Sequence, residues 1–216
     1  MSSDSFLTID TTGHGEIKEK GSKFIAFASP VRTEDDVEKT LLKLKEEYPK
    51  ASHYCYAFKT GPNGEHYRMN DDGEPSGTAG KPILGQITRS GLSDTMVIVI
   101  RYFGGTKLGV SGLIQAYKEA ANKAIEAATF KEVIVQDTYL LEFNYADMGH
   151  IMSVLKELPL EIKQKKFDAY CKVTFNVRQS KASDTIKKLS AGILRVSTEE
   201  IKVSTEIPGC TLTKMQ

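Results

Sequence analysis

The 216-residue sequence contains no tryptophan and only three cysteines, and it carries almost no net charge. Cys55, Cys171 and Cys210 do not have the spacing of a metal-binding or redox motif, and an odd number is a poor basis for a disulfide framework. We therefore expect free thiols in a reducing compartment and no disulfide-linked partner. A net charge of +1 excludes a general nucleic-acid coat, but a local cationic patch remains open.

Long hydrophobic runs are also absent. The longest run, Met96–Ile100, has five residues, whereas a membrane-spanning helix needs about 20. Residues 1–15 are polar and lack the apolar region of a secretory signal. We expect a cytoplasmic protein with no membrane partner. The chain is long enough for one large domain or two small ones.

Hydrophobic periodicity predicts a mixed α and β domain over residues 16–134, preceded by residues 1–15, which we expect to lie across the surface or fray. The run Met96–Ile100 is too apolar for an exposed strand and predicts a central one. Thr33 is the expected N-cap of a helix that Pro49 stops. The expected strands are 24–27, 52–58 and 96–100, and the expected helices are 33–48, 82–88 and 111–128.

The pattern changes near residue 135. Strands are expected at 133–143, 160–167, 170–177 and 199–205, and helices at 147–157 and 183–189. This βαββαβ order within about 80 residues is the ferredoxin-like order. We therefore expect an α+β protein, with a boundary between residues 134 and 135.

Two glycine-rich loops stand out in the first domain. The loop Gly104–Gly112 lies between the buried strand and a helix, and Arg101 and Lys107 add positive charge to it. Consecutive backbone N–H groups followed by a helix N-terminus form an anion-binding concavity. The loop matches neither a Walker A motif nor a dinucleotide fingerprint. A phosphate site and a tight turn with glycines needed for packing both remain open.

The other loop, Asp71–Lys81, is acidic at its start. Asp71, Asp72 and Glu74 crowd together, and three carboxylates are suited to Mg²⁺ or to acid–base chemistry. Asp72 and Glu74 are the weak candidates for a catalytic role. The spacing does not match a calcium-binding loop, and a solvated turn is the plainer interpretation, so we expect no metal and no cofactor.

Histidine and cysteine also alternate on one expected strand. His53 and Cys55 should point to the same face, with His66 beyond the following turn. A structural zinc site needs four ligands, and no fourth is evident nearby. A Cys–His nucleophilic pair is no better supported, and ordinary strand residues remain the alternative.

The segment 101–109, Arg-Tyr-Phe-Gly-Gly-Thr-Lys-Leu-Gly, and the segment 72–82, Asp-Gly-Glu-Pro-Ser-Gly-Thr-Ala-Gly-Lys-Pro, resemble motifs of the YigZ/IMPACT family. The segments 21–24 and 53–57 fit as well, so the resemblance covers residues 16–128. The remainder resembles the C-terminal domain of the bacterial members. The resemblance implies a first domain similar to domain 2 of ribosomal protein S5 and a ferredoxin-like second domain similar to one in elongation factor G.

The family's eukaryotic members resemble translation regulators that compete for a ribosome-associated activator of an initiation-factor kinase. Those members use an additional domain to recognise partners, so their role is not carried over whole. For bacterial members the resemblance implies contact with RNA or the ribosome, by analogy of fold alone.

The leading hypothesis is an RNA-binding or ribosome-associated protein that modulates translation through a glycine-rich face. An enzyme acting on a phosphorylated small molecule, of the kinase or phosphatase type, is the runner-up, and a protein-interaction module is a third possibility. Residues 75–118 hold five basic residues against one acid, Asp94, and 8 of the 17 glycines. The residues expected to contact phosphate or bases are Arg101, Tyr102, Gly104, Gly105, Lys107, Gly109, Ser76, Thr78, Lys81, Arg68, Tyr54 and Tyr56, with Phe103 as a further aromatic.

Overall fold

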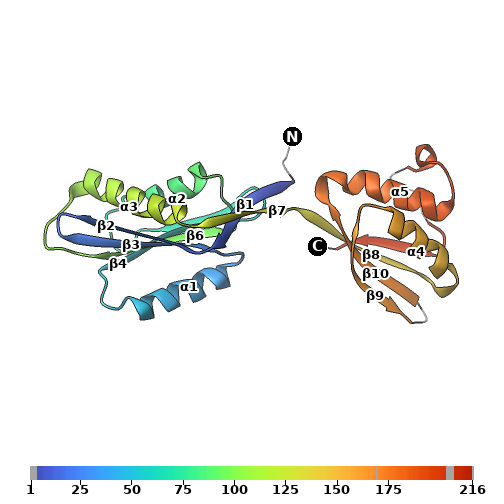
Figure 1. Cartoon of the computed structure of the whole chain (residues 1–216), viewed down its shortest axis with the longest axis horizontal. Coiled ribbons are helices and arrows are strands. Elements are labelled where there is room, and N and C mark those ends of the chain that lie inside the picture. The colour runs from blue at the N-terminus through green and yellow to red at the C-terminus, as the bar shows by residue number, and fades with distance from the viewer. Residues whose placement is uncertain (1–3, 169, 203–206, 216) are drawn as a thin grey trace. The chain divides into compact units, whose positions relative to one another are not determined.

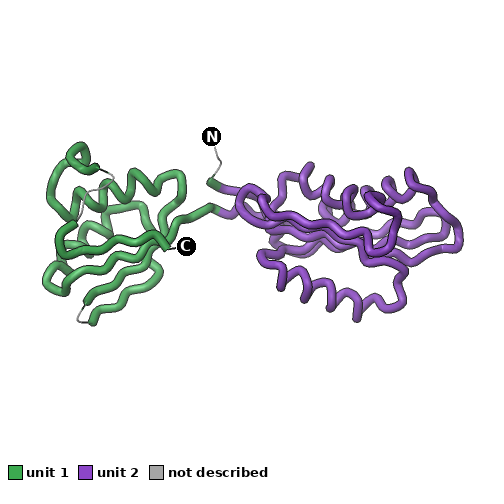
Figure 2. The backbone as a smooth tube through the Cα atoms, turned by 180° about the vertical axis from the view of Figure 1, so that it is seen from behind, with its two compact units in different colours: residues 1–4, 134–216 green, residues 5–133 purple. Residues whose placement is uncertain are grey.

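The structure is a computed structural model that describes residues 4–168, 170–202 and 207–215. It divides into two compact units (Figure 2). Residues 5–133 form the N-terminal unit, and Asp4 belongs with the described part of residues 134–216 in the C-terminal unit. No described helix is both long and apolar enough to cross a membrane. All three cysteines are free thiols.

A five-stranded antiparallel sheet forms the centre of the N-terminal unit, with strand order β2-β3-β6-β4-β5. The strands are β2 (Gly13–Glu19), β3 (Ser22–Pro30), β4 (His53–Thr60), β5 (His66–Asn70) and β6 (Thr95–Tyr102). Every residue of β6 except the last is buried. The central strand predicted from Met96–Ile100 is therefore confirmed.

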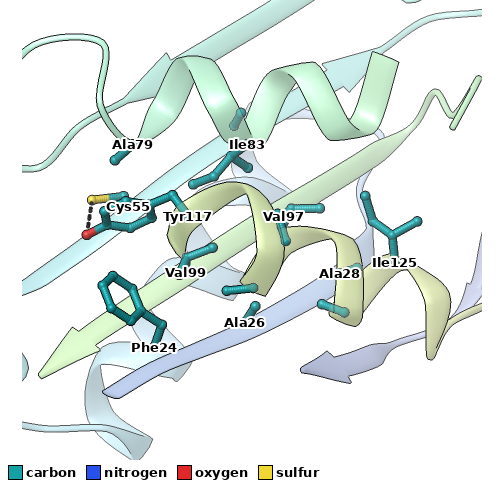
Figure 3. Packing of buried hydrophobic residues seen from close by; sticks show 14 of the residues in the cluster. Phe24, Ala26, Ala28, Cys55, Ala79, Ile83, Val97, Val99, Tyr117 and Ile125 are labelled. Carbon is teal, nitrogen blue, oxygen red and sulfur yellow. Dashed lines mark hydrogen bonds between the residues drawn. The ribbon is translucent and has the colours of Figure 1, made fainter. Parts of the chain in front are cut away.

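Helices cover both faces of this sheet, as Figure 1 shows. Helix α1 (Glu34–Glu47) lies on one face, and α2 (Gly80–Arg89) and α3 (Gly109–Glu126) lie on the other. Side chains alternate along a strand, so Val97 and Val99 pack beneath α2 and α3, whereas Ile98 and Ile100 pack with α1. Figure 3 shows the first of these two cores.

Thr33 begins α1 as predicted. Its hydroxyl accepts a hydrogen bond from the Asp36 amide at 3.2 Å, and the Asp36 carboxylate accepts one from the Thr33 amide at 3.0 Å. This reciprocal pair is a capping box, which satisfies two of the amides left unpaired at a helix start.

The expectation for residues 1–15 is wrong over the described residues 4–15, and residues 1–3 lie outside the described residues. β1 (Ser5–Thr11) pairs with β7 (Thr129–Ile134), Ile9 is fully buried, and β2 begins at Gly13. Helix α3 packs directly against the backbone of β2. A Cβ added to Gly15 would lie only 2.6 Å from the Ala124 nitrogen, so this position has no room for a side chain. Strand β2 therefore lacks the apolar alternation that predicts a strand.

The C-terminal unit has a four-stranded antiparallel sheet in the order β11-β8-β10-β9. Helices α4 and α5 contribute to the same core as the sheet. The predicted βαββαβ order is present. The elements are β8 (Gln136–Asn144), α4 (Met148–Glu157), β9 (Glu161–Phe167), β10 (Tyr170–Arg178), α5 (Ala182–Leu194) and β11 (Cys210–Lys214).

Two strand boundaries in this region differ from the prediction. The strand expected at 133–143 is two strands, β7 and β8, separated at Val135. The last strand is β11 rather than residues 199–205. Residues 198–200 form a 3-10 turn that Ser197 caps, and residues 203–206 lie outside the described residues. Strand β11 has no buried residue, so its sequence carries little strand signal.

Candidate functional site

A buried carboxylate connects the first glycine-rich loop to β6 and α3, the two elements that flank the second loop. Glu74 lies in the first loop, and its Oε1 accepts hydrogen bonds from Arg101 Nη1 at 2.6 Å and from the Tyr117 hydroxyl at 2.7 Å. Arg101 lies near the end of β6 and Tyr117 two turns into α3. All three residues are buried. A buried charge requires a partner of opposite sign, and Glu74 and Arg101 supply it to each other.

His53 and Cys55 of β4 face this network, which confirms that they share a face. His53 Nε2 lies 3.8 Å from Glu74 Oε1, and the Cys55 thiol lies 3.3 Å from the Tyr117 hydroxyl (Figure 3). Burial raises the pKa of the Cys55 thiol far above its usual value. A thiol that stays protonated is a poor nucleophile and metal ligand. His66 is on the exposed edge strand β5.

The other two acids of the loop bind backbone. Asp71 accepts hydrogen bonds from the amides of Gly77, Ala79 and Gly80 and so caps the start of α2. Burial alone would raise the pKa of Asp71, but these amides lower it below its usual value. Asp72 accepts a hydrogen bond from the Tyr54 amide at 2.6 Å. The carboxylates of Asp71 and Asp72 thus accept hydrogen bonds from backbone amides of the protein itself.

These contacts give the candidates for catalysis structural roles. Oε1 of the buried Glu74 carboxylate accepts two hydrogen bonds, from Arg101 and from Tyr117. The Asp72 carboxylate accepts a hydrogen bond from the Tyr54 amide, and the Asp72 carbonyl oxygen lies 2.7 Å from His53 Nδ1. Among the described residues no group of three or more His, Cys, Asp or Glu side chains is placed to hold a metal ion.

The second loop is fixed by close backbone contact. A Cβ on Gly104 would lie 1.9 Å from the Gly21 carbonyl carbon, in the turn between β2 and β3. The Ser22 hydroxyl accepts hydrogen bonds from the Gly104 amide at 3.2 Å and from Arg101 Nη2 at 3.3 Å. Arg101 therefore binds the first loop through Glu74 and the β2–β3 turn through Ser22, whereas Glu74 makes the contact with α3 through Tyr117.

The residues beyond this anchored layer are open to solvent. We define the loop face as the β2–β3 turn, the tip of the first loop, and the second loop with the start of α3. The start of α3 and the β2–β3 turn lie together at the end of the sheet away from β1 and β7 (Figure 1). No side chain caps α3. The loop face comprises the exposed residues Lys20, Ser76, Phe103, Gly104, Gly105, Thr106, Lys107, Gly109, Val110 and Ser111, together with the half-buried Gly77.

Only some of the residues predicted to contact phosphate or bases lie on the loop face. Ser76, Gly104, Gly105, Lys107 and Gly109 are on the loop face, and the exposed side chain of Lys81 is on the first turn of α2. Neither Lys81 nor Lys107 forms an ion pair with a described residue.

Arg101 and Thr78 are 5% and 2% exposed, so the expectation of direct phosphate contact does not fit their burial. The Thr78 hydroxyl donates to the Pro75 carbonyl oxygen.

The tyrosines predicted to contact bases lie on the face of the sheet that α1 covers. Tyr54, Tyr56 and Tyr102 pack against the core beneath α1. The Tyr54 hydroxyl donates to the Tyr48 carbonyl oxygen and the Tyr102 hydroxyl to that of Pro49. Arg68 pairs across the strands with Phe58 of the same core, and directly paired residues share a face. These four residues are therefore not brought together with Lys107.

Sequence reasoning missed three residues of the site. Tyr117 was expected only as part of the buried stripe of α3, because an aromatic at helical spacing gives no sign of a polar contact. Ser22 and Lys20 belong to a turn 80 residues before the second loop in sequence. A sign was present at Lys20-Gly21, a typical turn pair, but nothing in the sequence places that turn against Gly104.

Comparison with known proteins supports the family suggested by the two motifs. A family model described as the Impact N-terminal domain matches residues 20–125. The IMPACT family member YvyE of Bacillus subtilis is 36% identical over 74% of this chain and 74% of its own length. The IMPACT family member YigZ of Escherichia coli is 29% identical over 79% and 85%.

A solved crystal structure, described only as that of a hypothetical protein, has 27% identity and a TM-score of 0.70 over 98% of both chains. The fold of the whole chain is thus shared with an experimental structure. The family model matches the unit that carries the two motifs, and the bacterial relatives match most of the chain. This chain therefore belongs to the IMPACT family.

Proposed function

We propose that this protein is an RNA-binding or ribosome-associated factor that modulates translation, and that the loop face is its contact surface. One observation carries the proposal. A buried network holds two glycine-rich loops against each other, and it leaves the backbone of Gly105 and Thr106 and the side chain of Lys107 exposed to solvent. Phosphate oxygens are bound by backbone amides and by cations, so the loop face suits a phosphate of a nucleic-acid backbone.

Charge supports a polyanion as the ligand. Residues 95–118 contain no acidic residue, and the acids of the first loop are held by backbone amides or by Arg101 and Tyr117. Lys20 and Lys107 therefore project from a surface without a competing carboxylate in the second loop. Family membership favours translation as the setting, because the eukaryotic members resemble translation regulators.

Fold supports the same setting by analogy. We propose that the N-terminal unit is similar to domain 2 of ribosomal protein S5 and that the C-terminal unit is ferredoxin-like. The βαββαβ order with the sheet order β11-β8-β10-β9 supports the second assignment. Fold alone does not establish function, so the loop face carries the proposal.

The test is a titration of fluorescently labelled single-stranded RNA, followed by anisotropy between about 50 and 200 mM salt. Affinity should fall as salt rises, because binding releases counterions. Lys107→Ala should weaken binding and lower the log–log salt slope by about 0.7, the value for one single-strand phosphate contact. Lys43→Ala is the matched control, since this exposed lysine is on α1, on the other face of the sheet.

Absence of salt-sensitive binding up to tens of micromolar protein would contradict the proposal. Equal effects of Lys107→Ala and Lys43→Ala would place binding elsewhere on the protein. Thermal stabilisation by a nucleotide or sugar phosphate in place of RNA would favour the small-molecule enzyme instead. A saturating ligand, at about 100 times its Kd, should stabilise the fold by roughly 2.7 kcal/mol.

A further inference from the structure

Phe103 is an aromatic side chain without a structural role in either core. It is 49% exposed and belongs to none of the buried clusters, although it directly follows the buried strand β6. Single exposed apolar side chains are common on protein surfaces, so the position of Phe103, rather than its exposure alone, is what points to a ligand. The ring lies on the loop face and directly precedes the exposed glycines and Lys107 of the second loop.

The ring is held before any ligand arrives. The Phe103 amide donates to the Ser52 hydroxyl at 3.2 Å, which fixes the backbone. The Arg101 guanidinium carbon lies 5.4 Å from the centre of the ring, and Glu74 in turn holds that guanidinium. A pre-organised aromatic loses little conformational freedom on binding. The exposed half of the ring is thus a fixed, flat, apolar surface.

The surroundings of the ring favour a nucleobase over an apolar protein side chain. Gly104 and Gly105 follow at once with exposed backbone, and Lys107 supplies a positive charge two residues later. A flat surface beside amides and a cation fits a base with its attached phosphate. Val110 and Ile114 are also exposed on the first turns of α3, and they would suit a protein partner, which the experiment below distinguishes.

We infer that Phe103 stacks on an unpaired base of RNA, so that the loop face selects single-stranded over double-stranded RNA. This inference rests on the proposed function and deepens it. Bases in a duplex already stack on one another, and only a base that is free of its neighbours can cover a protein aromatic. Phosphate contacts at Lys107 alone would give no such preference.

The absence of tryptophan provides a direct reporter. Phe103→Trp would carry the only tryptophan in the 216-residue chain, and a base stacked on an indole quenches its fluorescence. Short oligouridine should quench Phe103→Trp, and an RNA duplex should not. Leu42→Trp is the matched control, because Leu42 is 61% exposed on α1, on the other face of the sheet. Its fluorescence should not respond to oligouridine.

Affinity gives a second readout. Phe103→Leu should weaken binding of oligouridine between about fivefold and 150-fold, the measured range for losing one stacked base. Phe103→Trp should keep wild-type affinity, and neither change should alter duplex binding. Circular dichroism and the thermal midpoint of Phe103→Leu should match wild type, because the ring is outside both cores.

The outcomes separate this inference from the proposed function. If Lys107→Ala weakens binding but Phe103→Leu does not, or if duplex and single strand bind equally well, the stacking is overturned and the RNA contact stands. If wild-type protein binds no RNA, both fail. A protein captured through Val110 and Ile114, with no quenching by RNA, would also overturn the inference.

Discussion

Glu74 and Arg101 form an ion pair whose side chains are only 3% and 6% exposed. In the low dielectric of the interior, a buried charge that loses its partner is strongly destabilising. The same pair connects the first loop to β6 and, through the Tyr117 hydroxyl, to α3. At the residue scale, then, the polar side chains of the site act mainly by positioning the exposed loops.

Glu74→Gln should lower the free energy of unfolding by about 3–5 kcal/mol, because Arg101 would stay buried without a counter-charge. This loss is measured by urea unfolding, with circular dichroism as the signal. Glu119→Gln is the control, since Glu119 lies 3.7 Å from Lys123 and both side chains are 48% exposed. Glu119→Gln should change the free energy of unfolding by no more than about 0.5 kcal/mol. Equal costs for the two changes would show that the buried pair is not a structural anchor.

Asp71 gives the loop a pH dependence. The amides at the start of α2 favour its charged form, so its pKa in the folded protein is below the usual value. Its contribution to stability is complete above the ordinary pKa and is lost as the pH falls through the lowered one. The stability difference between wild type and Asp71→Asn should therefore be largest above about pH 4 and shrink below it. An equal difference at every pH would contradict this account.

At the scale of elements, the two loops are attached to the fold by different means. The first loop is held by its own side chains, which bond to backbone. The second is held by backbone packed on backbone at Gly104 and Gly21 and by the Ser22 and Ser52 hydroxyls. These attachments do not use the side chain of Lys107. The loop face can therefore bind a ligand without loss of its supports.

Gly104→Ala should destabilise the protein by about 1–3 kcal/mol, because its Cβ would overlap the Gly21 backbone, which has no side chain to move. Gly85→Ala on α2 is the matched control. A Cβ there meets no atom within 4 Å, and alanine should stabilise a helix by up to about 1 kcal/mol. Thermal unfolding compares the two. Tolerance of alanine at position 104 would mean that the turn and the loop are not in contact.

The sequence predicted elements with strong local patterns and missed those without them. The apolar run of β6, the N-cap Thr33 of α1 and the βαββαβ order were all readable from spacing. β5 is exposed at every position and β2 packs through glycines, so neither has an apolar alternation. For the site, the two loops were predicted, but the Glu74–Arg101 contact joins residues 27 apart. Burial of Arg101 could not be read from a cation beside a glycine loop.

At the scale of the whole molecule, two units carry separate cores on one chain. Each core is made by residues of its own unit, and Asp4, which binds Arg178, belongs with the C-terminal one. The loop face is made entirely by the N-terminal unit. The proposed RNA contact therefore involves residues of the N-terminal unit alone.

Separate cores predict separate losses of stability. Ile98→Ala and Leu141→Ala each remove a buried side chain, which should cost about 2–5 kcal/mol. In native-state hydrogen exchange, Ile98→Ala should reduce protection only in residues 5–133, and Leu141→Ala only beyond residue 133. Loss of protection across both units from either change would show that they unfold as one.

The most direct test of the central claim is an NMR titration of the full-length, isotope-labelled protein with short oligouridine. Contact at the loop face predicts that the backbone amides of Gly104, Gly105, Lys107 and Ser111 shift first and most. The amides of α1 and of the C-terminal sheet should stay in place. Shifts confined to those other surfaces, or none at saturating RNA, would contradict the account.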